Sequence, residues 1–72
     1  MSRIIAKTNS FTNARIARGW TQRDLAHYCN ISPGYISLIE RGIKSVGPRT
    51  AKRISEALHK QWEELFFLQN ED

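Results

Sequence analysis

The chain has little of what several classes of protein require. Its single cysteine, Cys29, excludes an internal disulfide and suits a reducing cytosol. No apolar run reaches the length needed to cross a bilayer, and no secretory signal is recognisable at the start of the sequence. Alternating apolar and polar segments, which are typical of strands, are also few. These absences favour a small helical domain in the cytoplasm, without membrane contact.

Groups that carry chemistry are equally sparse. His27 and His59 stand apart, with no cysteine or carboxylate at ligand spacing, so no metal site is expected. The sequence holds no nucleophile–base pair, carboxylate pair or glycine-rich phosphate loop, and 72 residues leave little room for a sheltered pocket. We therefore expect no enzyme, no cofactor and no small-molecule substrate.

Acidic residues are scarce over most of the chain. Residues 1–55 carry ten Lys or Arg against two acidic residues, a net charge of +8. Residues 56–72 carry one Lys against five acidic residues, a net charge of −4. A basic body favours a polyanion such as double-stranded DNA, with the acidic end facing away from it. A surface that only keeps the protein soluble would also explain so modest a total charge. The position of the cations relative to the segment from Thr21 to Arg41 is what favours DNA as the partner.

Cap and turn signals predict one domain over residues 1–72, with an all-α fold of five helices. Residues 1–9 are expected to form an arm with Ile4 and Ile5 against the core, and residues 69–72 an acidic tail. The first helix should be capped by Asn9 or Ser10 and closed by Gly19. The predicted helices span residues 11–18, 21–29, 32–42, 48–58 and 61–68.

The segment from Thr21 to Arg41 carries the most information. Thr21 is an N-cap that Asp24 completes in the manner of a capping box. Asn30 stands at a sharp turn, because asparagine tolerates positive φ better than most residues. Ser32 then caps a second helix, with Pro33 at its first position. Two short helices joined by a tight turn, inside a basic segment, indicate a helix-turn-helix.

Apolar periodicity predicts the core. Ala26 is expected where the second and third helices cross closely, so a larger side chain there would push them apart. The predicted core residues are Ile16, Leu25, Ala26, Cys29, Ile31, Ile36, Ile39, Ile54, Leu58, Trp62, Leu65 and Phe66.

The run RGWTQRDLAHYCNISPGYISLIERG resembles the Cro/CI-type (XRE) helix-turn-helix family of phage repressors and related bacterial regulators, and ALHKQWEELF resembles the closing helix of that family. The resemblance covers residues 10–68 and implies a compact lambda-repressor-like fold. It also implies a structural salt bridge from Arg15 to Glu40. The short length and the arm are similar, more narrowly, to modulator-of-repression (antirepressor) proteins of Gram-positive temperate phages, which act together with a CI-like repressor.

In the resembled family, the positions that face base edges correspond here to Pro33, Gly34, Ser37 and Leu38, with Lys44 in the following loop. Forked polar side chains suit base edges, yet Pro33 and Gly34 offer no side-chain donor. Leu38 can contact only a thymine methyl group. The second helix of the helix-turn-helix is therefore expected to recognise bases poorly.

Phosphate contacts are better supplied. Gln22 matches the family residue that grips a phosphate, although Pro33 replaces its usual glutamine partner. Tyr35 and Leu38, beside Arg41 and Lys44, would form an apolar patch with a basic rim that suits a protein partner. Tyr35 could equally be a packing residue. The candidate contacts for DNA or a partner are Gln22, Arg23, Pro33, Gly34, Tyr35, Ser37, Leu38, Arg41 and Lys44.

Three functions stay open on the sequence. The favoured one is a phage-type transcriptional regulator of a lysis–lysogeny switch, which binds a CI-like repressor through the helix-turn-helix face and holds DNA weakly or cooperatively. A stand-alone, Cro-like homodimer that binds operators directly is the second. An antitoxin that binds a toxin is the third. Phe67 and Leu68 would form either an oligomer surface or a simple closing cap.

Overall fold

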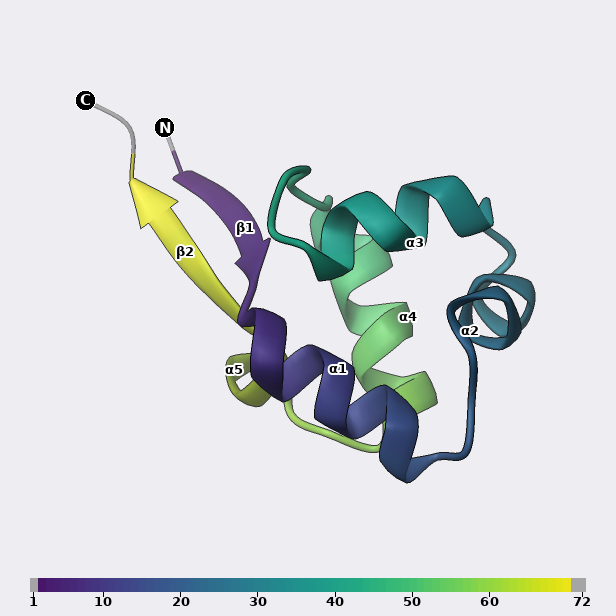
Figure 1. The fold of residues 1–72 in the computed structure, drawn as a ribbon. Helices are drawn as coiled ribbons and strands as arrows, with labels where there is room; N and C mark the ends of the chain where they lie inside the picture. Colours follow the sequence, from purple (N-terminus) through teal and green to yellow (C-terminus); the bar gives the residue numbers. More distant parts are fainter. Residues whose placement is uncertain (1, 71–72) are drawn as a thin grey trace.

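The computed structural model describes residues 2–70, so Glu71 and Asp72 of the predicted acidic tail lie outside the described residues. Helices α1 to α4 pack around one core, and a two-stranded sheet projects from one side of them (Figure 1). No helix within residues 2–70 is long and apolar enough to span a membrane. The elements, in chain order, are β1 (Ser2–Ala6), α1 (Thr8–Ala17), α2 (Gln22–Cys29), α3 (Pro33–Glu40), α4 (Pro48–Leu58), α5 (Trp62–Leu65) and β2 (Phe66–Asn70).

The predicted caps of α2 and α3 are confirmed. The Thr21 hydroxyl accepts the Asp24 amide at 3.1 Å, and the Asp24 carboxylate accepts the Thr21 amide at 2.9 Å. Asn30 ends α2 in the left-handed conformation, with φ at 58°. The Ser32 hydroxyl then accepts the Tyr35 amide at 3.0 Å, and Pro33 occupies the first turn of α3. Local sequence alone therefore determines where this helix pair begins and turns.

Helix α1 begins before the predicted cap residues. Its first residue is Thr8, and Lys7 precedes it in extended conformation without a side-chain cap. The Lys7 amide donates to the Leu65 carbonyl at 2.7 Å, while the Lys7 carbonyl accepts the Phe11 amide at 2.8 Å. Asn9 and Ser10 consequently lie inside the helix. A long-range contact with Leu65, rather than a local cap, marks the start of α1.

The prediction of a purely helical fold is corrected by the sheet. The expected closing helix over residues 61–68 ends at Leu65, and Phe66–Asn70 continues as β2. β2 pairs antiparallel with Ser2–Ala6 of the predicted arm, with Ile4 opposite Leu68 and Ala6 opposite Phe66. Both segments are rich in side chains that favour strands, and each supplies the backbone partners that the other lacks. The fold is thus five helices with a small sheet.

Most of the predicted core is confirmed, with two corrections. Ile16 is 60% exposed and Trp62 is 38% exposed, whereas Phe11 is fully buried. Five residues separate Phe11 from Ile16, which places them roughly 140° apart around a helix, so both cannot face inward. Phe11 instead packs edge-to-face against Phe66, with ring centroids 5.9 Å apart. Ile31 is half-buried and packs against the core.

Ala26 is fully buried between α2 and its neighbours. We predict that Ala26→Leu lowers the free energy of unfolding by about 1–3 kcal/mol, because the added carbons overpack the crossing. Urea denaturation followed by circular dichroism measures this change. Ala17→Leu, at an exposed position of α1, is the matched control and should shift stability little. Equal stability of Ala26→Leu and the parent would contradict the close crossing.

Candidate nucleic-acid interface

The positions of α2 and α3 are fixed by one buried carboxylate. Glu40, at the end of α3, is 6% exposed. It accepts the Arg15 Nε at 2.8 Å, the Arg15 Nη2 at 2.9 Å and the Thr12 hydroxyl at 2.8 Å. Arg15 Nη1 also donates to the Trp20 carbonyl at 2.7 Å, just before α2. The pair that the family resemblance implied therefore joins α1, α3 and the segment leading into α2.

These hydrogen-bond donors stabilise the ionised form of the Glu40 carboxylate. Burial by itself acts to raise the pKa of Glu40, but hydrogen bonds from Arg15 and Thr12, with a smaller contribution from Gln22, bring the pKa below its ordinary value of 4.5. A lowered carboxyl pKa stabilises the folded state above the ordinary pKa. That stabilisation is lost as the pH falls through the lower, folded-state pKa.

We predict that Glu40→Gln lowers the free energy of unfolding at neutral pH by about 2–4 kcal/mol, because Arg15 keeps a charge without its partner. Urea titrations of both proteins at a series of pH values measure this. The difference between them should shrink under acidic conditions, below pH 4.5, as the parent's carboxylate takes up a proton. Glu56→Gln, at an exposed site on α4, is the control. A difference that stays constant at low pH would contradict the role of the Glu40 charge.

The solvent side of α3 carries few groups that could read bases. Pro33 and Gly34 are exposed, while Ser37 and Leu38 are half-buried. A Cβ built on Gly34 would meet nothing within 4 Å, so packing does not require glycine there. Room for a longer side chain exists at this position, but the sequence supplies none. Among these four residues only Ser37 has a polar side chain.

Tyr35 has a structural role in this region. Its hydroxyl donates to the Ser45 carbonyl at 3.2 Å, and the ring is half-buried against the core. The residue therefore ties α3 to the loop that follows it, the loop that contains Lys44. This geometry favours the packing interpretation of Tyr35 over the predicted surface contact.

Exposed cations surround α3. Arg23, Arg41 and Lys44 are exposed, and Arg41 Nε donates to the Ser37 carbonyl at 3.4 Å. Gln22 is half-buried on the side of Glu40. The three cations can contact phosphates, which provide affinity without sequence information. The candidate residues are thus mostly brought together around α3, with Tyr35 and Gln22 turned partly inward.

Sequence reasoning missed two exposed features near the helix pair. Ile43 is 58% exposed in the loop after α3, and its amide donates to the Leu38 carbonyl at 3.0 Å. The rings of Trp20 and Tyr28 contact each other with centroids 5.1 Å apart and a tilt of 36°, and the Arg18 guanidinium lies 4.6 Å from the Trp20 centroid. Ile43 could have been noticed as an apolar residue directly between Gly42 and Lys44.

Arg53 and Cys29 contact each other at the end of α2. Arg53 Nη1 donates to the Cys29 carbonyl at 3.1 Å, at the end of α2. Cys29 is fully buried, and burial raises the pKa of its thiol. Within residues 2–70, no three His, Cys, Asp or Glu side chains gather as a metal site would need.

Two capped helices around a left-handed turn, with cations around the second, define the class of helix-turn-helix DNA-binding proteins. The chain belongs to the helix-turn-helix family HTH_3, whose model matches residues 13–65. No curated protein matches the chain.

Solved structures of regulators share the fold. The clp gene regulator ClgR from Corynebacterium glutamicum aligns with a TM-score of 0.72 and 32% identity over 79% of this chain and 61% of that chain. The restriction-modification controller protein C.AhdI from Aeromonas hydrophila aligns with a TM-score of 0.72 and 24% identity, over 79% of this chain and 86% of that chain. The wild-type restriction-modification controller protein C.Esp1396I aligns with a TM-score of 0.66 and 30% identity, over 75% of this chain and 70% of that chain. This chain spans less than two thirds of the ClgR chain. The family match and these neighbours show that the chain has the helix-turn-helix fold found in such regulators.

Proposed function

We propose that the chain is a phage-type transcriptional regulator that acts as a modulator of a CI-like repressor. It holds duplex DNA weakly through α2 and α3, and it docks on the repressor through the same face. Docking changes the repressor's hold on its operators. The observation that carries this proposal is the contrast on α3, where exposed cations surround a surface with almost no base-reading side chains.

The cations support the DNA-binding part. Arg23, Arg41 and Lys44 are exposed and lie in α2, directly after α3 and in the following loop, respectively. Phosphate contacts from such residues give affinity that falls steeply with salt. They do not distinguish one operator from another, so this chain needs a second source of sequence specificity.

The apolar residues support the partner-binding part. Leu38 is half-buried and Ile43 is 58% exposed, and backbone hydrogen bonds join their segments. Together with the flanking Arg41 and Lys44, they form the Leu38–Ile43 patch. An apolar centre with a charged rim is the usual composition of a protein interface. A CI-like repressor, which already binds operators, would supply the missing specificity.

A self-sufficient Cro-like repressor is the second candidate, because the helix-turn-helix family match over residues 13–65 fits it equally well. It requires a sharp sequence preference from the isolated protein. The few polar groups on α3 argue against that preference.

We predict that Lys44→Ala weakens binding to every duplex by a similar factor, because Lys44 contacts phosphate. The slope of log affinity against log salt should fall by about 1. Fluorescence anisotropy with a labelled duplex, measured over a salt series, gives both quantities. Lys60→Ala, an exposed cation beyond α4, is the control and should leave both unchanged. An unaltered slope in Lys44→Ala would contradict a phosphate contact.

We predict that Leu38→Asp abolishes complex formation with the CI-like repressor, because a carboxylate enters the centre of the patch. Co-purification of the two chains measures this, and circular dichroism verifies the fold of the variant. Ile16→Asp is the matched control, since Ile16 is an equally apolar residue on α1 that is 60% exposed. If the Leu38→Asp protein still co-purifies with the repressor, the proposal that this patch binds the repressor is contradicted.

A further inference from the structure

A groove lies between α4, the turn that precedes α5 and the small sheet. Its volume of about 580 Å³ is within the range of about 300–1,000 Å³ that is usual for sites that bind small molecules. None of its lining residues belongs to α2 or α3. A ligand in the groove would therefore leave the helix-turn-helix face uncovered.

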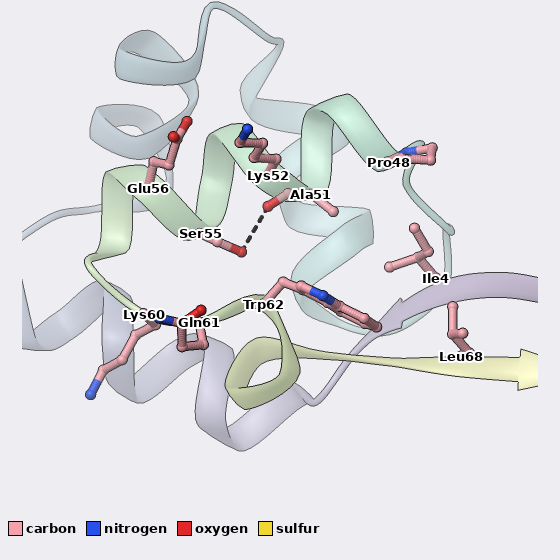
Figure 2. A pocket seen from close by; sticks show the side chains of 10 residues that line it. All are labelled: Ile4, Pro48, Ala51, Lys52, Ser55, Glu56, Lys60, Gln61, Trp62 and Leu68. Atoms are coloured by element: carbon pink, nitrogen blue, oxygen red, sulfur yellow. Dashed lines mark hydrogen bonds between the residues drawn. The ribbon is translucent and has the colours of Figure 1, made fainter.

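The end of the groove next to the sheet is apolar. Ile4 stands opposite Leu68 on the paired strands, and Figure 2 shows both side chains close to Pro48 at this end. The Trp62 ring lies between the sheet and α4 in the same view. Trp62 is 38% exposed and Leu68 is 53% exposed. A flat apolar ligand would remove this hydrocarbon surface from water.

The opposite end of the groove is polar, and its charge is positive on balance. Lys60 and Glu56 lie at this end, away from the sheet, and Lys52 lies about one turn before Glu56 on α4 (Figure 2). Two ammonium groups therefore stand beside one carboxylate. Within residues 2–70, neither lysine side chain has a hydrogen bond or an ion pair. Such ammonium groups favour an anionic head group, because a carboxylate can accept charge-assisted hydrogen bonds from them.

We propose that this groove binds a small apolar monocarboxylate of the aromatic acid class. The ring system lies against Trp62 and Leu68, and the carboxylate points toward the ammonium groups of Lys52 and Lys60. The amphipathic lining carries this assignment, because its apolar end and its cationic end match the two ends of such an acid. The site is distinct from the Leu38–Ile43 patch and from the cations around α3.

Proton–nitrogen correlation NMR of the full chain, titrated with naphthalene-2-carboxylate, tests this proposal. The chain has two tryptophans, so the indole N–H signals of Trp62 and Trp20 give an internal comparison, and Trp20→Phe assigns them. The Trp62 signal should shift and saturate with a Kd of about 1 mM or tighter. The Trp20 signal should stay in place, because that ring contacts Tyr28 and does not line the groove.

The charge of the head group is tested with naphthalene-2-methanol, which has the same rings without the carboxylate. It should bind about threefold more weakly or worse. The double variant Lys52→Gln, Lys60→Gln should weaken binding of the acid by about threefold or more and leave binding of the alcohol unchanged. Arg18→Gln, which removes an exposed cation outside the groove, is the control and should keep both affinities.

The apolar end is tested with Leu68→Gln, which should weaken binding of the acid by about threefold or more because apolar contact area is lost. Phe67→Gln is the matched control. Phe67 is 41% exposed, and its side chain points to the other face of β2, so this variant should bind as the parent does. Circular dichroism verifies that each variant is folded.

Three results would overturn the proposal: a Trp62 signal that stays in place up to the solubility limit of the acid, equal affinities for the acid and the alcohol, or an unchanged affinity in Leu68→Gln. A Trp62 signal that shifts with protein concentration alone, and that the acid does not reverse, would also overturn it, since a second copy would then cover the groove. None of these titrations contains DNA or a repressor, so their outcome is independent of the proposed function.

Discussion

The ion pair between Arg15 and Glu40 is the interaction on which the arrangement of this molecule depends. One carboxylate, 6% exposed, accepts hydrogen bonds from two residues of α1 and thereby holds the end of α3. Arg15 also reaches the Trp20 carbonyl before α2. Three segments of the helix-turn-helix unit are thus oriented by polar contacts that need the correct geometry of every partner. Breaking such a network costs more than the network adds in net stability, because the remaining partner stays charged and buried.

The orientation fixed by this pair determines what α3 presents to solvent. Glu40 and Ile36 face the interior, and Gly34, roughly 160° around the helix from Ile36, faces solvent, while Pro33 is exposed because it lies in the first turn of the helix. The surface near α3 is rich in cations and poor in forked polar groups. Tyr35, bonded to Ser45, holds the loop that contains Lys44 and Ile43. The fold therefore places exposed cations and an apolar patch on this surface, with few side chains of the kind that read bases.

The sequence predicted correctly those features that depend only on neighbouring residues. The Thr21 and Ser32 caps and the Asn30 turn each depend on residues within a few positions, and they occur as expected. The pairing of Ser2 with Asn70 spans nearly the whole chain, and no local pattern indicates it. A short helix followed by a strand in EELFFLQN is also ambiguous, because one apolar run suits either structure. Ile16 was misplaced because Phe11, not Ile16, lies on the inner stripe of α1. The Tyr35 hydroxyl could not be assigned a partner before the loop was seen.

The most direct test is the affinity of the isolated protein for an operator duplex and for a scrambled duplex of equal length, measured over a range of salt. A surface that contacts phosphates and reads few bases should bind both within about tenfold of each other, with a steep dependence on salt in both cases. Specific regulators prefer their sites by about a thousandfold or more. A preference of that size, from this chain without any companion, would contradict the account.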